Sequence, residues 1–154
     1  MGQSAAKWCS CRWEDGCVTA WVPDWDDFPE SLLEFWSERH LCTLTTLRID
    51  GRPHVTPVGV ALDVEWQCAW VITSRSSLKA VHASADPRVA ACQVAGRRWS
   101  TIEGTVEVRS DPASIRRAEE RYAVRYRTPR PNPSRVALRI QVDRFLRSSG
   151  LTSQ

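Results

Sequence analysis

Apolar and polar residues alternate over several short segments of the chain, which is the pattern of strands that bury one face. Turn residues separate these segments, and the pair Asp50-Gly51 is typical of a type I′ hairpin turn. Gly96-Arg97 predicts a second hairpin, and Gly104 predicts a bulge or a close backbone contact within a strand. Six strands are expected in all, at residues 41–49, 54–62, 67–74, 88–95, 99–109 and 134–142.

Three segments instead carry the 3.6-residue spacing of helices that bury one face. The first covers residues 29–39, with Asp27 as its N-cap. The second covers residues 76–85, and the third opens at Asp111-Pro112. The proline-rich run at residues 128–133 predicts a stiff, extended loop after the third helix.

Short antiparallel strands with glycine kinks favour a sheet that closes on itself over an open one. We therefore expect a mostly β fold with flanking helices, a six-stranded antiparallel split or closed β-barrel over residues 27–150. Residues 1–26 show neither period and are expected to form a poorly ordered extension. Its cysteines, Cys9, Cys11 and Cys17, lack the C-x₂-C pairing and the fourth ligand of a zinc site, so no metal centre is expected.

The composition is that of an ordinary globular protein and excludes several classes. Of 154 residues, 42% are apolar and 25% are charged, which fits one domain and excludes a largely disordered chain. No run approaches about 18 consecutive apolar residues, and the N-terminus lacks the apolar core of a signal peptide. We therefore expect a cytoplasmic protein without a membrane partner, its six cysteines present as free thiols.

The charge balance draws attention to one side chain. The net charge of +3, from 21 basic and 18 acidic residues, is too small to indicate a nucleic-acid partner by itself. Glu119 and Glu120 also interrupt the arginine-rich stretch at residues 116–135, which favours solvent exposure, an anionic ligand or a subunit contact over nucleic acid. Lysine is rare, and Lys79 is the only one in the body of the chain.

The segment around Lys79 combines features that bind phosphate. An apolar strand ends in Thr73 and Ser74 and enters a helix with Lys79 in its first turns. Free amides at a helix N-terminus and nearby hydroxyl and cationic donors attract phosphate. An ordinary capped turn between a strand and a helix has the same sequence, so both interpretations stay open. No Ser-His-Asp arrangement or familiar nucleotide motif is present, which favours a bound cofactor as the source of any chemistry.

Several short motifs resemble a known family. They include Ser37-Glu38-Arg39-His40-Leu41, Cys92-Gln93-Val94 and the run Arg125-Tyr126-Arg127-Thr128-Pro129-Arg130-Pro131-Asn132-Pro133, in the order that the family shows. From about residue 28 to 150 the chain is similar to the split β-barrel flavin and deazaflavin oxidoreductases related to pyridoxamine-phosphate oxidase, and within them to the actinobacterial F420-dependent biliverdin reductases. The resemblance implies a homodimer with two cofactor sites at the subunit interface.

The resemblance also implies where the cofactor lies. Its phosphate would sit on the strand-to-helix corner, its ring against the neighbouring strands, and Arg127, Arg130 and Asn132 would reach it from the partner subunit. His82 departs from the family pattern, which has Asn there. No catalytic side chain and no metal ligand are implied. The full set of implied cofactor-binding residues is Val55, Thr56, Pro57, Val71, Ile72, Thr73, Ser74, Arg75, Lys79, Ala80, Gln93, Gly96, Arg98, Trp99, Arg127, Arg130 and Asn132.

Coenzyme F420 is the cofactor that the resemblance implies, with hydride passing from the reduced deazaflavin to an unsaturated acceptor, biliverdin giving bilirubin. FMN stays open as an alternative, because both cofactors present a phosphate to the same corner. A non-catalytic carrier of F420 or of a tetrapyrrole is a third reading. The expected partners are a second copy of the chain and a small-molecule acceptor such as a tetrapyrrole.

Overall fold

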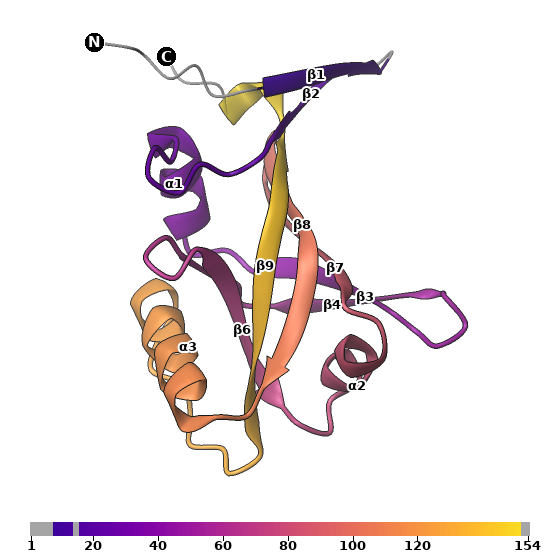
Figure 1. The fold of residues 1–154 in the computed structure, drawn as a ribbon. Helices are drawn as coiled ribbons and strands as arrows, with labels where there is room; N and C mark the ends of the chain where they lie inside the picture. Colours follow the sequence, from indigo (N-terminus) through magenta and orange to yellow (C-terminus); the bar gives the residue numbers. More distant parts are fainter. Residues whose placement is uncertain (1–7, 14–15, 152–154) are drawn as a thin grey trace.

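The computed structural model describes residues 8–13 and 16–151, with side chains from residue 19 onward. Nine strands and three α-helices occur in this part of the chain, and a short 3-10 helix, Ser149–Leu151, ends it (Figure 1). The helices are α1 (Glu30–Ser37), α2 (Leu78–Ala85) and α3 (Pro112–Arg125). The strands are β1 (Trp8–Trp13), β2 (Gly16–Trp21), β3 (Cys42–Leu47), β4 (Pro53–Val58), β5 (Ala61–Asp63), β6 (Cys68–Ser74), β7 (Arg88–Ala95), β8 (Arg98–Arg109) and β9 (Arg135–Arg147).

One antiparallel sheet contains all of these strands, as the hairpin pattern predicts. Its order is β1-β2-β9-β8-β7-β3-β4, and β6 pairs with both β9 and β5. The long strand β9 is the spine of the sheet, since it pairs with β2, β6 and β8. Along the path β5-β6-β9-β8-β7-β3-β4, strands β5 and β4 are the two ends. Only Gly59 and Val60 separate these strands in the chain, so the sheet must curl to bring its two ends together.

The expected count of six strands is wrong for the described residues, for two reasons. The segment predicted as one strand at 54–62 divides at Gly59 and Val60 into β4 and β5. The N-terminal hairpin of β1 and β2 adds two more strands where a poorly ordered extension was expected. Residues 1–7 and 14–15 of that extension, and the side chains of its three cysteines, lie outside the described residues.

The N-terminal segment joins the fold through aromatic packing. Trp21 is 1% exposed, and its ring lies 5.0 Å from that of Phe28 and 5.6 Å from that of Phe145. Trp25 stacks on Phe28 at 5.6 Å. Because Phe145 lies at the far end of the chain, no local period in residues 1–26 predicts its contact with Trp21.

Three glycines meet a local structural need, two by adopting a positive φ in a turn and one by allowing close backbone contact. The Asp50-Gly51 hairpin forms, but Gly51 has φ +82° and no non-glycine residue of the turn has a positive φ, so the turn is not type I′. Gly96, at φ +62°, opens the expected two-residue turn between β7 and β8. The bulge expected at Gly104 is confirmed, and a Cβ there would stand 1.9 Å from the carbonyl oxygen of Gln141.

The helices begin close to their predicted positions. Pro29, not Asp27, occupies the N-cap of α1, and no side chain caps that helix. Ser77 caps α2 by accepting a hydrogen bond from the amide of Ala80, and Asp111 caps α3 through the amide of Ser114, as its sequence predicts. No helix among the described residues is both long and apolar enough to cross a membrane.

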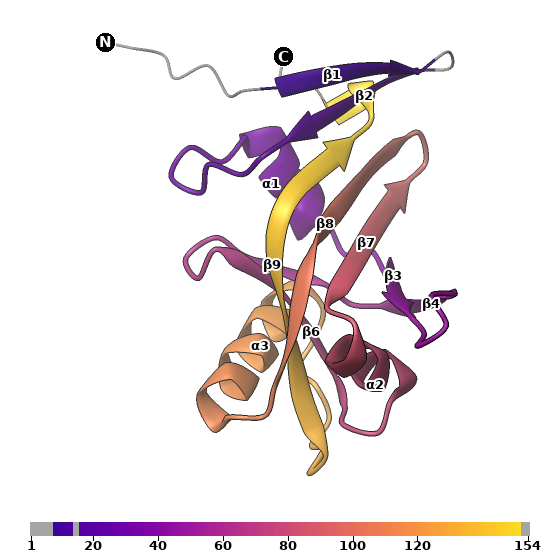
Figure 2. The same ribbon diagram turned by 45° about the vertical axis from the view of Figure 1, so that its right-hand side comes forward.

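Two apolar clusters hold the helices to the sheet. The larger fills the inside of the curled sheet and includes Leu32, Phe35 and Trp36 of α1 and Ala80 and Ala83 of α2. The smaller lies under α3 and is made of Cys68, Trp70, Ala118 and Ala137. As a result α2 and α3 lie on opposite sides of the lower part of β6 and β9 (Figures 1 and 2).

Candidate functional site

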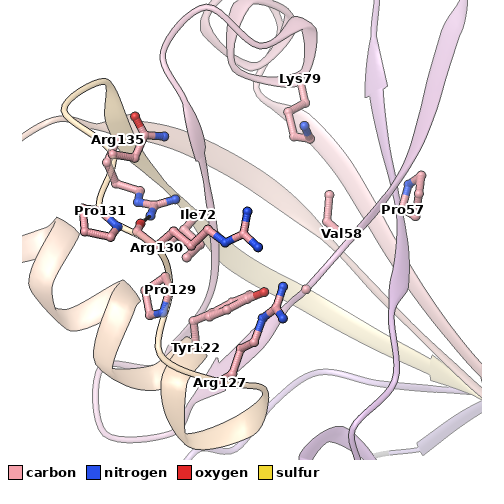
Figure 3. A pocket seen from close by; sticks show the side chains of 12 residues that line it. Pro57, Val58, Ile72, Lys79, Tyr122, Arg127, Pro129, Arg130, Pro131 and Arg135 are labelled. Carbon is pink, nitrogen blue, oxygen red and sulfur yellow. Dashed lines mark hydrogen bonds between the residues drawn. The ribbon is translucent and has the colours of Figure 1, made fainter.

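The main cavity of interest lies where β6, the end of α3 and the proline-rich loop meet near Lys79 (Figure 3). It has a volume of about 430 Å³ and is called here the Lys79 pocket. Its lining residues are Pro57, Val58, Gly59, Ile72, Lys79, Tyr122, Arg127, Pro129, Arg130, Pro131, Asn132 and Arg135.

The strand-to-helix corner beside this pocket is ordered by its own hydroxyl groups. Thr73 Oγ1 donates to Ser77 Oγ at 2.9 Å, and Lys79 Nζ donates to Thr73 Oγ1 at 3.4 Å. Ser77 in turn caps α2. The corner is therefore a capped turn that also holds the Lys79 ammonium group in place. A capped turn and a phosphate-binding site, the two interpretations that the sequence left open, are compatible.

The proline-rich loop is fastened to the same corner. Asn132 Nδ2 donates to Ser74 Oγ at 2.9 Å, and the amide of Arg75 donates to the carbonyl of Ser134 at 2.8 Å. Arg135 pairs with Glu119 at 3.0 Å and also donates to the carbonyl of Arg130 at 2.5 Å. These bonds hold the loop across the mouth of the pocket.

The charge of the pocket is one-sided. Four cations line it, Lys79, Arg127, Arg130 and Arg135, and no carboxylate does. Arg135 is neutralised by Glu119, whereas the other three cations have no carboxylate partner among residues 19–151. A cavity lined by one sign of charge attracts ligands of the opposite sign, here phosphate or carboxylate groups.

Tyr122 contributes an aromatic ring to the lining of the pocket. The rings of Tyr122 and Tyr126 lie 4.9 Å apart at 33°, and a Cβ on Gly59 would stand 2.7 Å from the Tyr122 ring and 2.9 Å from that of Tyr126. The hydroxyl of Tyr126 donates to the carbonyl of His40 at 2.7 Å, and burial raises the pKa of Tyr126 to about 12. Within the pocket the Tyr122 ring lies beside Arg127, and the Tyr126 ring packs against it from outside the lining (Figure 3).

The structure brings together only part of the predicted site. Pro57, Ile72, Lys79, Arg127, Arg130 and Asn132 line the pocket, and Thr73 and Ser74 border it through hydrogen bonds. Within one chain the two arginines and Asn132 line the same cavity as Lys79, and their expected approach from the partner subunit stays a prediction. The predicted set does not contain the other lining residues, which are Val58, Gly59, Tyr122, Pro129, Pro131 and Arg135.

Five of the predicted residues on β4, on β6 and beside α2 do not line this pocket. Val71 and Ala80 are buried in the larger apolar cluster, so they pack the corner against the core and do not face the pocket. Val55 is exposed, as is Arg75, and Thr56 is half-buried. Strand alternation explains the result on β6, because Val71 and Ile72 point to opposite faces of the sheet.

The predicted segment around the β7–β8 turn is engaged elsewhere. Gln93 is fully buried, donates to the carbonyl of Phe35 at 2.7 Å and accepts from Arg125. Arg98 pairs with Glu38 at 2.7 Å, and hydrogen bonds from Arg98 hold the pKa of Glu38 below its usual value. Within this chain Gln93 and Arg98 therefore fasten α1 to the sheet, while Gly96 and Trp99 lie at the same turn and do not line the Lys79 pocket.

His82 belongs to a small cluster beside Lys79. Its Nδ1 lies 3.3 Å from Thr46 Oγ1, and its ring lies 4.9 Å from that of His54 at 76°. His54 Nδ1 is buried without a hydrogen-bond partner. Desolvation, then the charges of His82, Arg48 and Lys79, lower the pKa of His54. In the part of the chain that the structure describes, no group of three or more potential metal ligands gathers.

Comparison with known proteins shows which sequences this chain is similar to. The sequence pattern of the family described as Pyridoxamine 5'-phosphate oxidase matches residues 28–148. A Mycobacterium tuberculosis protein (strain CDC 1551 / Oshkosh) named F420H(2)-dependent biliverdin reductase is 49% identical over 122 residues, which cover 79% of this chain and 89% of the relative.

Solved structures share the fold. A conserved hypothetical protein from Mycobacterium tuberculosis superposes with a TM-score of 0.67 at 26% identity, covering 83% of this chain and 91% of that one. A protein described as F420 Reductase superposes with a TM-score of 0.62 at 23% identity, covering 76% of this chain and 97% of that one. The antiparallel sheet with three helices is thus an arrangement already seen in other proteins.

Proposed function

Since this chain belongs to the pyridoxamine 5'-phosphate oxidase family, we propose that it is a reductase that binds coenzyme F420 in the Lys79 pocket. The proposed acceptor is an unsaturated small molecule, with biliverdin, giving bilirubin, as the first candidate. The relative named F420H(2)-dependent biliverdin reductase supports this proposal, as does the protein described as F420 Reductase. The observation that carries it is a cavity lined by three cations without a carboxylate partner among the described side chains and by the Tyr122 ring.

The residues of the pocket fit such a cofactor. Lys79 would hold the phosphate at the corner, where Thr73 fixes its ammonium group. Arg127 and Arg130 would bind the further carboxylates that F420 carries and FMN lacks, which favours F420 over FMN. Tyr122 and Ile72 would cover one face of the ring and exclude water from it.

When bound in its reduced form, the deazaflavin supplies a hydride for the acceptor. The protein's contribution is then to bind the cofactor and to orient the ring and the acceptor relative to each other. The rigidity of the corner serves this purpose, because β6, α2 and the proline-rich loop meet there and are joined by side-chain hydrogen bonds.

We further propose that two copies of the chain assemble. Apolar side chains stand exposed on α2 and β4, namely Leu78 at 58%, Val81 at 52% and Val55 at 58%. Exposed apolar groups gathered on adjoining elements are typical of association surfaces. Light scattering on the purified protein checks this, and a mass of one chain at micromolar concentration contradicts it.

Titration of the protein with F420 and, separately, with FMN tests the cofactor, with ligand fluorescence as the signal. Lys79→Met should raise the F420 dissociation constant about tenfold or more, from the loss of one charge-assisted contact. Arg52→Gln is the matched control, because Arg52 pairs with Asp50 on an exposed turn away from the pocket. Tight FMN binding without F420 binding would exclude the proposal, and F420 binding without turnover of biliverdin would favour the carrier.

A further inference from the structure

A second cavity of about 300 Å³ adjoins the Lys79 pocket. The two share Tyr122 and Arg127, and the second is otherwise lined by Arg39, His40, Leu41 and Tyr126. It is called here the Arg39 lobe. Neither sequence motifs nor the resemblance assigned it a role.

Resting on the proposed function, we propose that the Arg39 lobe binds the acceptor, and that it selects flat, conjugated acceptors carrying carboxylate groups. In this arrangement the Lys79 pocket holds the cofactor and the shared Tyr122 and Arg127 lie between the two ligands. Arg39 is then a specificity-determining residue that contacts an acceptor carboxylate.

The charges of the lobe favour an anionic group. Arg39 and Arg127 have no carboxylate partner among the residues with described side chains. The nearby Glu38 is held by both Arg98, at 2.7 Å, and His40, at 3.1 Å, so its charge is already compensated. A ligand carboxylate would therefore meet the Arg39 guanidinium group, with that of Arg127 shared with the cofactor, and no acid in the lining.

The apolar parts of the lobe favour a flat conjugated body. Leu41 is 65% exposed, so its apolar side chain is open to contact by a ligand in the lobe. The Tyr126 ring forms the inner wall and continues into Tyr122 through their stacked contact at 4.9 Å. A planar ligand could cover Leu41 and Tyr126 while its acidic substituents reach the arginines.

The lobe is held in shape by a buried cation. Arg125 donates to the carbonyl of Glu38 at 2.8 Å and 3.0 Å, and also to the carbonyl of Val60 and to Gln93 Oε1. Tyr126 donates from its hydroxyl to the carbonyl of His40 at 2.7 Å. These bonds fix the backbone on both sides of Arg39, so the lobe is pre-organised and its occupation costs little conformational entropy.

Steady-state kinetics with biliverdin and with its dimethyl ester test the assignment. Arg39→Gln should raise the KM for biliverdin about tenfold, with kcat and the F420 dissociation constant changing by less than about twofold. The same substitution should leave the KM for the dimethyl ester nearly unchanged, because the ester has no charge for Arg39 to pair with. Arg116→Gln, an exposed arginine on α3 that lines neither cavity, is the matched control.

Three results would overturn the inference. An unchanged KM for biliverdin removes Arg39 from the acceptor site, and equal losses for the acid and the ester exclude carboxylate recognition. A raised F420 dissociation constant in Arg39→Gln would show that the lobe holds the cofactor's own acidic tail. If the wild-type protein does not turn over, the proposed function fails separately, and absorbance titration of biliverdin into both proteins still decides whether Arg39 binds it.

Discussion

Arg117 on α3 and Arg127 two residues beyond the helix end differ in every contact that their guanidinium groups make. Arg117 donates to both carboxylate oxygens of Asp63 at 2.7 Å and to Glu65 at 2.7 Å, and it lies over the ring of Trp66. Arg127 lines two cavities and has no carboxylate partner in the described part of the chain. The comparison shows that pairing, and not residue type, separates arginines that hold the fold from arginines available to a ligand.

The paired region has the properties of a structural clamp. Asp63 is 1% exposed and also accepts hydrogen bonds from Trp70 Nε1 at 2.9 Å and from the amide of Trp66 at 3.3 Å. Burial acts to raise the pKa of Asp63, but the hydrogen bonds from Arg117, Trp70 and Trp66 outweigh it and leave the pKa below its usual value. The clamp joins α3 to β5 and β6, and none of its residues lines the Lys79 pocket.

Breaking this clamp should have the largest effect on stability. Asp63→Asn should lower the free energy of unfolding by about 3 kcal/mol or more, because Arg117 would lose its buried charged partner and keep only the exposed Glu65. Glu65→Gln, at the exposed end of the same cluster, should cost less than about 1 kcal/mol. Urea unfolding followed by tryptophan fluorescence measures both, and equal losses for the two variants would contradict the division between a buried and an exposed partner.

Gly59→Ala should disturb the Lys79 pocket by steric crowding, without changing its charge. The added Cβ would meet the rings of Tyr122 and Tyr126, so we expect a loss of about 1–3 kcal/mol in unfolding free energy and weaker F420 binding. Gly150→Ala is the control, because its Cβ would meet atoms no nearer than 3.9 Å. Full stability and unchanged binding in Gly59→Ala would mean that the two tyrosine rings move freely.

Local sequence predicted the parts of the site whose contacts are local. The strand-to-helix corner depends on Thr73, Ser77 and Lys79, which lie within seven positions, and the structure places them together. Each of the six predicted strand segments holds strand in the structure, because apolar alternation reports burial on one face of a sheet.

The errors have long-range causes. Arg98, beside Trp99 in a hairpin, has the local sequence of a ligand-binding turn, but its partner Glu38 lies 60 positions away. Arg125 likewise reaches Glu38 and Gln93 across 87 and 32 positions. A single sequence gives no signal for such long-range pairings. It therefore could not separate the arginines that bind other residues of the chain from those that line the pocket.

The smallest expected effect concerns the pH dependence of stability and the contact between His54 and His82. His54 faces His82 and Lys79 on α2 and Arg48 at the end of β3, and all three act to lower its pKa in addition to desolvation. The usual pKa is 6.5, so as pH falls through that value the unfolded chain takes up a proton that the folded protein resists. Stability should therefore decline modestly as pH falls from about 7.5 to about 5.

The variant His54→Gln should flatten that part of the pH profile, because it removes the group that binds a proton in the unfolded chain alone. His82→Asn should flatten it less, since Lys79 and Arg48 still act on His54 after its ring neighbour is gone. Thermal unfolding midpoints of the three proteins, measured over this pH range at one ionic strength, give the comparison. Parallel pH profiles for the wild type and the two variants would mean that His54 has the same pKa in the folded protein and in the unfolded chain. The charges around His54 would then be screened by solvent as fully as charges on an exposed turn.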